Sequence, residues 1–422
     1  MKKELNERIG LNFNRLCNSY YQMEEVFSSP EYDWPGDKEG RALLAFVSHY
    51  KINGRINPCM HPMVAAMQAH TNQYGYFGPE SREVIFEQQL SGHNWYLRGL
   101  CEYYEQFRKE DVLNVLKSTV EHLYYPTMGR FKDYPIERKL VVDGGVSGNS
   151  LGNLAGWNLS TDIGCAFMSI DGLSHYYKLT RDHNVKILID EMIEIYASID
   201  KVKLQAQTHC TLTAARGMLR MYQIEGMQRY LEYAKDILQI YVSEGMTYTY
   251  QNYNWWGRGD TWTEPCAIVD SLMLAGELYK ITKRAEYQTL AARIYHNGLA
   301  SAQRNNGGAG TDTTVSTRIP VLKQKMYEAY FCCTMRLAEG LWYLSENQYI
   351  FTANQTGTVS KDACGRYMDG NIIYTEFSET MKPYINDEEI RVCEGHTLVP
   401  LLKYYKLPDE VGKTIEQRII YK

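Results

Sequence analysis

Residues 264–287 read EPCAIVDSLMLAGELYKITKRAEY, and this stretch holds the pattern that decides the fold. It predicts an apolar helix that ends near Tyr279, a short polar turn, and a second helix that starts near Ala285. A pair of helices of this kind has to bury its apolar stripe against neighbouring pairs. The stretch therefore predicts a fold that is assembled from repeated helical hairpins.

An aromatic residue near a helix end, followed by a polar turn and another helix, recurs along the first 345 residues. The recurring tyrosines, the last in a looser version of the pattern, are Tyr104, Tyr177, Tyr222, Tyr279 and Tyr343. Their spacings run from 45 residues (Tyr177 to Tyr222) to 73 (Tyr104 to Tyr177), which fits hairpins joined by variable loops. A closed ring of hairpins, the (α/α)6 barrel, buries such helices within one domain. An open solenoid is the alternative, but its repeats would be more uniform.

The pattern changes near Asn347. Segments 349–354 and 370–377 alternate in the manner of β-strands. We therefore expect a mainly α protein with two domains, an (α/α)6 barrel over residues 1–346 and a small C-terminal β-rich unit over residues 347–422. Cys364 and Cys393 of the second domain have no evident site role.

The composition describes a globular chain without a nucleic-acid or membrane partner. The 422 residues carry a net charge of −5, and Lys and Arg form no cluster that would attract phosphates. No apolar h-region follows the basic residues at the N-terminus, and no run approaches the roughly 18 apolar residues of a membrane span. Ten irregularly spaced cysteines do not form the framework of a secreted disulfide protein. We therefore expect a cytoplasmic protein.

Residues that carry chemistry stand at similar distances before the repeat tyrosines. His93 precedes its tyrosine by 11 residues and His209 precedes its own by 13. Two pairs lie 15 and 13 residues before Tyr279 and 11 and 10 before Tyr343, namely Glu264 with Cys266 and Cys332 with Cys333. A single His at a helix start is more often a cap or a core residue. If the inner helices run parallel, however, these six positions meet at one mouth and line one cavity.

Glu264, Cys266, Cys332 and Cys333 also match the ligands of a metal ion. Three thiolates and one carboxylate can complete a tetrahedral zinc site. Structural zinc sites usually hold their cysteines in turns, whereas these residues begin helices, where an open cavity can lie. The alternative is that the adjacent cysteines are buried free thiols. The second pair at an equivalent place favours a zinc site, and we expect bound Zn²⁺.

Three polar or aromatic loops lead to these helix starts, and they span residues 144–153, 250–260 and 305–312. The second loop contains Trp255 and Asp260 directly before Glu264. Amides, carboxylates and flat aromatic faces are groups with which proteins bind sugars. We therefore expect a small carbohydrate as the ligand, with Trp255 and Asp260 among its contacts. For the glycine-rich loops, flexible surface segments are the alternative.

The motifs resemble those of the β-L-arabinofuranosidase family, which is glycoside hydrolase family 127 and its relatives. The resemblance rests on Glu264-x-Cys266 opening one helix and Cys332-Cys333 opening another. Individually weaker matches are the glycine-aromatic turn 74–79, the Gly92-His93 helix, and Thr208-His209-Cys210. The similarity extends over much of the first 345 residues.

The resemblance implies an (α/α)6 barrel whose glutamate and three cysteines bind zinc. By matching position, Cys332 would attack the anomeric carbon of the sugar, and His93 and His209 would hold substrate hydroxyls. A zinc-bound thiolate stays deprotonated and reactive at neutral pH. A covalent sugar–sulfur intermediate that water then attacks retains the anomeric configuration. The implied activity is a retaining glycosidase of β-L-arabinofuranosidase type, acting on a small oligosaccharide.

The chain departs from the family pattern in three ways. Tyr248 stands near the position of the family's general acid, so we rank Glu244, then Asp260, then Asp162 as substitutes. A family histidine is missing near Ala166, and only about 75 residues stand in place of the family's large C-terminal β-domains. A non-catalytic zinc-containing sugar-binding protein is therefore the second hypothesis. Another α/α-barrel carbohydrate enzyme, such as an epimerase or a lyase, is the third.

Overall fold

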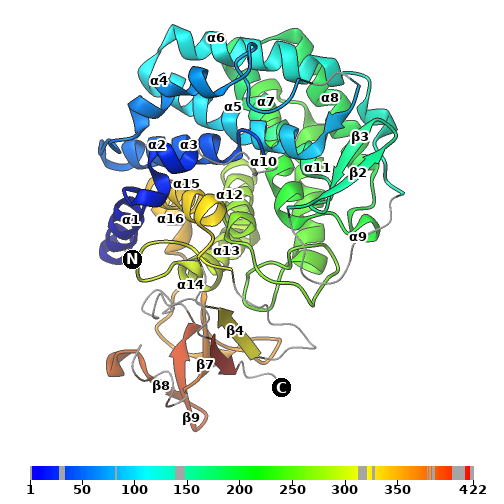
Figure 1. Ribbon diagram of the computed structural model, residues 1–422. Helices are drawn as coiled ribbons and strands as arrows, with labels where there is room; N and C mark the ends of the chain where they lie inside the picture. Colours follow the sequence, from blue (N-terminus) through cyan, green and yellow to red (C-terminus); the bar gives the residue numbers. More distant parts are fainter. Residues whose placement is uncertain are drawn as a thin grey trace. The chain divides into compact units, whose positions relative to one another are not determined.

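Figure 1 shows the computed structural model of the chain. It describes residues 2–27, 34–80, 83–137, 148–311, 321–325, 328–377, 379, 382, 385–401 and 414–418. The chain divides into two compact units, and each is described by itself. One unit is Leu16–Ile240, and the other joins Met1–Arg15 to Tyr241–Lys422.

The unit Leu16–Ile240 is built on long helices that pack side by side in chain order. Most of their residues are buried, and they are α3 (Asp37–Asn53), α5 (Glu87–Phe107), α7 (Ser169–Thr180) and α10 (Thr208–Glu225). Each packs on a more exposed helix that follows it, namely α4 (Met60–His70), α6 (Glu110–Thr119), α8 (His183–Ser198) and α11 (Gln228–Ile240). In α8 the buried residues recur every three or four positions, as on one face of a helix.

The recurring tyrosines close the hairpins through their backbone carbonyls. In four helices the residue after the helix end adopts a left-handed conformation, and its N–H donates to the carbonyl of the repeat tyrosine four positions earlier. The donors are Arg108, Arg181, Gly226 and Lys283. Only Gly226 enters this region without a steric cost to a side chain. In the looser repeat the Tyr343 carbonyl also accepts the N–H four positions later, that of Asn347 at 3.1 Å, but Asn347 is not left-handed (φ −125°).

The second unit contains two more long buried helices, α12 (Pro265–Thr282) and α15 (Met335–Glu346), which pack against each other. Helix α13 (Ala285–Arg293) packs on α12 and continues through a π-helical turn into α14 (Ala300–Ala302). Helix α1 (Lys2–Leu16) belongs to this unit over nearly its whole length. Within the described residues, no helix has the length and apolar character needed to cross a bilayer.

Short sheets accompany the helices. The first unit holds β1 (Ile85–Phe86), β3 (Trp157–Ser160) and β2 (Ser150–Leu154), in that order. The second unit holds an antiparallel five-stranded sheet of β5 (Ser360–Lys361), β6 (Tyr367–Asp369), β7 (Ile372–Glu376), β9 (His396–Pro400) and β8 (Arg391–Cys393). Strands β4 (Val321–Lys325) and β10 (Thr414–Arg418) form a separate antiparallel pair. The predicted C-terminal β-rich region is therefore present.

One strand prediction in this region is wrong. Residues 349–354 form no strand, because Gln348–Phe351 is the short helix α16 and turns follow it. Ile350 and Phe351 are adjacent and both buried, which a helix turn permits and an alternating strand does not. Phe351 packs edge-on against Tyr295 and Tyr343 of the helical layer. Tertiary packing therefore overrides the β-propensity of this segment, whereas the prediction for 370–377 is confirmed by β7.

Candidate active site and metal centre

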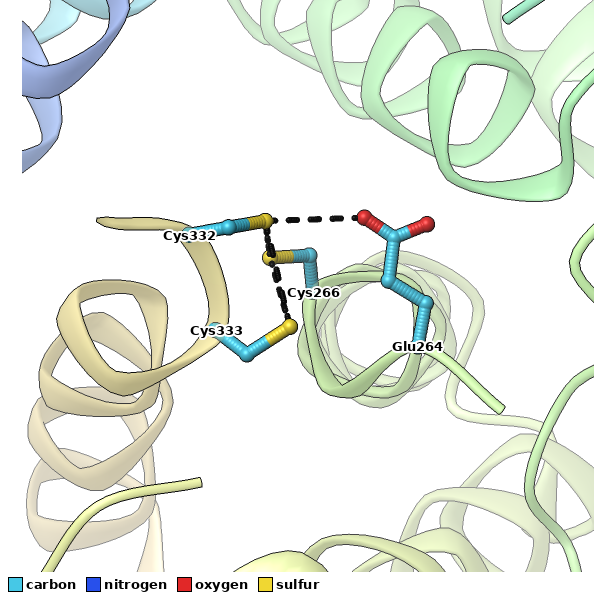
Figure 2. Close-up of side chains that lie close together, drawn as sticks. All are labelled: Glu264, Cys266, Cys332 and Cys333. Carbon is cyan, nitrogen blue, oxygen red and sulfur yellow. Dashed lines mark hydrogen bonds between the residues drawn. The ribbon is translucent and has the colours of Figure 1, made fainter. Parts of the chain in front are cut away.

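Glu264, Cys266, Cys332 and Cys333 come together at the starts of α12 and α15, as Figure 2 shows. One ligand atom from each of the four residues lies within 4.8 Å of the others. Cys266 and Cys332 are 66 residues apart in the sequence, but their Sγ atoms lie 2.9 Å apart. All ten cysteines are free, so no disulfide holds this cluster.

The local backbone explains how one helix start presents two ligands. Glu264 is the N-cap of α12 in an extended conformation (φ −127°), and Pro265 occupies the first helical position, where its fixed φ suits the helix. The Glu264 N–H donates to Oδ1 of the fully buried Asn252 at 2.9 Å. The Glu264 carbonyl accepts the N–H of Ile268. These bonds fix the backbone of Glu264 two residues before Cys266.

The adjacent cysteines lie in a π-helical turn, Tyr330–Thr334, which runs directly into α15; this segment is called the cysteine turn below. The prediction that the two cysteines open a helix is therefore confirmed in substance. The wider π-helical winding is often found at functional sites. Here it accompanies two neighbouring side chains that both reach Cys266, with Sγ separations of 2.9 Å for Cys332 and 3.6 Å for Cys333.

The spacing of the donor atoms suits a tetrahedral zinc ion. With Zn–S near 2.3 Å and Zn–O near 2.1 Å, sulfur atoms in such a site stand about 3.8 Å apart, and sulfur and oxygen about 3.6 Å. Cys333 Sγ lies 3.8 Å from Cys332 Sγ and 3.6 Å from Cys266 Sγ, and Cys332 Sγ lies 3.6 Å from Glu264 Oε1. The 2.9 Å separation of Cys266 Sγ and Cys332 Sγ is shorter than these three. All the donor atoms lie within 4.8 Å of one another, so the donor set has the chemistry and about the size of a zinc site.

Burial and mutual repulsion favour the neutral thiols of Cys266 and Cys333 when no cation is present. Burial raises the pKa of the Cys266 thiol well above its ordinary value, and the neighbouring Cys332 and Cys333 raise it further. Burial is also the main cause of the raised pKa of Cys333. A divalent cation reverses this balance, because it stabilises the thiolates that it binds. The arrangement is therefore suited to a metal ion.

His93, predicted to contact substrate, is fully buried and both its ring nitrogens have partners. Nδ1 lies 2.8 Å from the Gln89 carbonyl, and Nε2 accepts the Phe77 N–H at 3.0 Å. This pairing requires the neutral tautomer that is protonated on Nδ1. Burial lowers the pKa of His93 to about 4, which keeps it neutral. His93 holds the glycine-aromatic turn 74–79, and a sugar hydroxyl would compete with these bonds.

His209 lies in the first turn of α10, 2% exposed, and stacks on the ring of Trp95 with centroids 5.7 Å apart. His93 and His209 both belong to the unit Leu16–Ile240, whereas the four metal-ligand candidates belong to the other unit. The convergence of all six residues on one cavity therefore stays a prediction.

The candidate acids stand in different surroundings. Glu244 is exposed, in a π-helical turn (Tyr241–Gly245) that extends α11. Asp260 is exposed and forms two hydrogen bonds of 2.7 Å with the Arg258 guanidinium. Asp162, which belongs to the unit Leu16–Ile240, is buried before a short 3-10 helix, and its carbonyl accepts the Cys165 N–H. Tyr248 is half-buried.

The predicted sugar-binding loops have identifiable structural roles. Trp255 is 7% exposed and packs edge-on against Trp262. In the loop 305–312, a side chain on Gly307 would overlap the Leu11 carbonyl, and one on Gly308 would overlap the Glu328 carboxylate. These glycines therefore permit close packing. Residue 312 lies outside the described residues, as do residues 144–147 of the first loop.

Solved structures of low sequence identity have the same fold. A GH127 β-arabinofuranosidase has a TM-score of 0.55 at 13% identity, covering 88% of this chain and 63% of its own. A cellobiose 2-epimerase from Bacillus thermoamylovorans B4167 has a TM-score of 0.54 at 13% identity, covering 82% and 100%. A GH127 β-L-arabinofuranosidase from Geobacillus stearothermophilus T6 reaches 0.50 at 12% identity, covering 88% and 65%. The class is thus that of the (α/α)6-barrel proteins, and the predicted fold is confirmed.

Within this class the sequence identifies a family. The model of the β-L-arabinofuranosidase GH127 catalytic domain matches residues 44–346, which is well over half of the chain. The chain therefore belongs to the GH127 family, and the predicted family is confirmed. It spans 63% and 65% of the length of the two GH127 structures it resembles. No curated protein sequence matches it significantly.

Proposed function

We propose that the protein is a retaining glycoside hydrolase of β-L-arabinofuranosidase type that acts on a small oligosaccharide. In this proposal Glu264, Cys266, Cys332 and Cys333 bind one zinc ion, and Cys332 is also the nucleophile. Membership of the GH127 catalytic family supports the reaction class. The observation that carries the proposal is the close grouping of these four side chains, with ligand atoms within 4.8 Å of one another.

Differences in exposure favour Cys332 as the nucleophile. Cys266 and Cys333 are 0% and 1% exposed, whereas Cys332 is half-buried. A sulfur that attacks an anomeric carbon has to be reachable by the sugar. Cys332 also lies close to the carboxylate of Glu264, with 3.6 Å between Sγ and Oε1. A bound zinc ion would keep this thiol deprotonated, and the thiolate is the reactive form.

The chemistry then proceeds in two displacements. The Cys332 sulfur bonds to the anomeric carbon while the bond to the leaving oxygen breaks, and that oxygen takes a proton from an acid. Water then attacks the same carbon, the carbon–sulfur bond breaks, and the attacking water gives a proton to the conjugate base. Two inversions restore the original configuration. His209 and Trp255 are the proposed contacts of the sugar, with His93 and Asp260 as further candidates.

Glu244 is the first candidate for the acid. The carboxylate of Asp260 is engaged by Arg258, which lowers its availability as a proton donor. Glu244→Gln should lower hydrolysis of a natural oligosaccharide by about 10²–10⁴-fold. The same variant should turn over an activated aryl β-L-arabinofuranoside almost normally, because that leaving group needs little protonation. An equal loss on both substrates would argue against an acid role.

A covalent label tests the nucleophile. The protein is incubated with a haloacetamide derivative of L-arabinofuranose and digested, and its peptides are analysed by mass spectrometry. Labelling is expected at Cys332, and the exposed Cys364 serves as the control for non-specific alkylation. Preferential labelling of Cys333 would contradict the assignment. Elemental analysis of the purified protein should find one zinc per chain, and Cys266→Ala should lose it.

A non-catalytic, zinc-containing sugar-binding protein is the second candidate. Two observations favour it, namely Tyr248 near the place of the family's acid and the engagement of Asp260 by Arg258. Such a protein would bind zinc and a sugar without turnover of either kind of substrate. Zinc content together with the two hydrolysis assays separates this candidate from the enzyme. A metal-free barrel enzyme such as an epimerase would instead lack zinc altogether.

A further inference from the structure

Helix α1 contacts the cysteine turn although it lies outside the part of the chain that matches the GH127 family, which begins at residue 44. We propose that Arg15 and Asn12 of α1 are positioning residues for the metal centre, and that they act through Glu328 and Thr334. This inference rests on the proposed zinc site. It extends the centre to a segment that the family match does not include.

Arg15 fixes the entrance to the cysteine turn. Its Nε and Nη2 donate to the two carboxylate oxygens of Glu328, at 2.9 and 2.6 Å. Its guanidinium also lies over the ring of Tyr330, 5.3 Å from the ring centroid. The two charged side chains are 10% and 6% exposed, so solvent screens their attraction weakly. Two-point contact of this kind fixes orientation as well as distance.

The exit of the turn is fixed by the same group of residues. Thr334 is fully buried, and its hydroxyl donates to Glu328 Oε1 at 2.8 Å and accepts the Ala309 N–H at 2.9 Å. Its carbonyl accepts a hydrogen bond of 3.1 Å from Asn12 Nδ2. Asn12 also donates to the Gly307 carbonyl at 3.0 Å. Cys332 and Cys333 therefore lie between two anchored ends.

The packing leaves little room for this turn to shift. The segment around Gly307 and Gly308 passes between α1 and Glu328 so closely that neither position accommodates a Cβ atom. A change at Arg15 leaves the Glu328 carboxylate buried without its cation, which is costly. We expect the cost to appear as movement of the cysteine turn, because Glu328 bonds directly to its last residue. Loss of such outer partners typically weakens metal binding about 10–100-fold.

Zinc affinity tests the inference in the full-length protein. Zinc is titrated against a chromophoric chelator, and Arg15→Ala should raise the zinc dissociation constant about 10–100-fold. Arg15→Lys should recover part of the affinity, because it keeps the charge but not the two-point contact. Asn12→Ala should weaken binding in the same direction.

Arg8→Ala is the matched control. Arg8 lies on the same helix and is 1% exposed, but it bonds to the Ala300 carbonyl and the Gln303 side chain instead of the cysteine turn. Its loss should leave zinc affinity unchanged at matched protein stability. Wild-type affinity in Arg15→Ala, or an equal loss in Arg8→Ala, would overturn the inference.

A second measurement keeps the inference testable if the zinc proposal fails. Metal-free protein is treated with iodoacetamide, and the labelling rate of the buried Cys333 is compared with that of the buried Cys101 in α5. Arg15→Ala should speed labelling of Cys333 several-fold and leave Cys101 unchanged. Absence of zinc from the wild type would reject the proposed function, whereas unchanged Cys333 labelling would reject the positioning role.

Discussion

Two polar clusters, one partly and one fully buried, lie one helical turn apart along α12 and α15. The ligand cluster, Glu264 with the three cysteines, stands at the helix starts. The arginine cluster follows, where Arg336 of α15 pairs with Asp270 of α12 at 2.5 Å and with Glu339 of its own helix. All three members of the arginine cluster are at most 1% exposed.

The difference between the clusters lies in the sign of their charges. In the arginine cluster the positive charge of Arg336 offsets negative charge of the two carboxylates within the fold. In the ligand cluster every ionised form is an anion, so ionisation has to be balanced by a cation from outside the chain. Burial of polar groups is therefore not by itself a sign of function. A partly buried group of ligands with a single sign of charge is the more informative feature.

Among the substitutions that test this comparison, Cys332→Ser in the ligand cluster should have the largest effect. It removes the sulfur that we assign as nucleophile, and it also removes one metal ligand. Hydrolysis of an aryl β-L-arabinofuranoside should fall by about 10⁴-fold or more, as expected when a nucleophile is lost. Cys364→Ser, a change at an exposed cysteine, should leave the rate unchanged. Substantial turnover in Cys332→Ser would show that another group attacks the sugar.

Arg336→Met tests the arginine cluster in the same way. The variant leaves the Asp270 and Glu339 carboxylates buried without their cation, and it should lower the free energy of unfolding by about 3–5 kcal/mol. Zinc content per folded chain should stay the same, since the arginine is no metal ligand. The measurement is denaturant unfolding together with elemental analysis. A loss of stability below about 1 kcal/mol would mean that Arg336 does not offset the charge of these carboxylates as described.

His93 is a third case for the comparison, because it is a buried polar group whose ring nitrogens both have hydrogen-bond partners inside the fold. Its pKa is lowered from 6.5 to about 4, so the folded protein binds its proton less readily than the unfolded chain does. Its stabilising contribution is complete above pH 6.5 and is lost as the pH falls towards 4. The shift corresponds to about 3 kcal/mol by pH 4.

The measurement compares wild type with His93→Gln in urea unfolding at pH 7 and pH 4. On acidification the free energy of unfolding should fall further in the wild type than in the variant, and the difference should equal the contribution of His93. Other buried histidines, such as His175 with a pKa of about 4, remain in both proteins and cancel in the difference. Parallel losses in the two proteins would contradict the assignment of the neutral form to His93.

Short sequence patterns predict much of the fold and the four metal-ligand candidates of the site. The repeat tyrosines mark hairpins because each capping bond spans only four residues, as between Tyr104 and Arg108. The acid-thiol pair and the adjacent cysteines were each visible as short motifs. The sequence does not tell how close the two motifs lie in space, and the structure shows that their ligand atoms lie within 4.8 Å of one another.

Contacts between distant segments were not predictable. His93 was a candidate ligand of the sugar by its position, but its second ring partner, Phe77, comes from a turn 16 residues away. Arg15 and Glu328 are 313 residues apart, and neither belongs to a recognisable motif. Residues 349–354 carry a strand-like pattern that packing converts into a helix. In each case the deciding term is tertiary contact, which propensity and spacing do not encode.

Asp260→Asn should have the smallest effect, and it compares one kind of ion pair in two environments. Arg258 and Asp260 are joined by two short hydrogen bonds, as Arg336 and Asp270 are joined by one, but the Asp260 side chain is 49% exposed. Solvent and salt screen an exposed pair, so the free energy of unfolding should fall by less than about 1 kcal/mol and should change less still at high salt. The rate on natural oligosaccharides is measured in the same variant. A loss of about 10²-fold or more there, with stability unchanged, would transfer the acid role from Glu244 to Asp260, because the exposed pair would then serve the reaction instead of the fold.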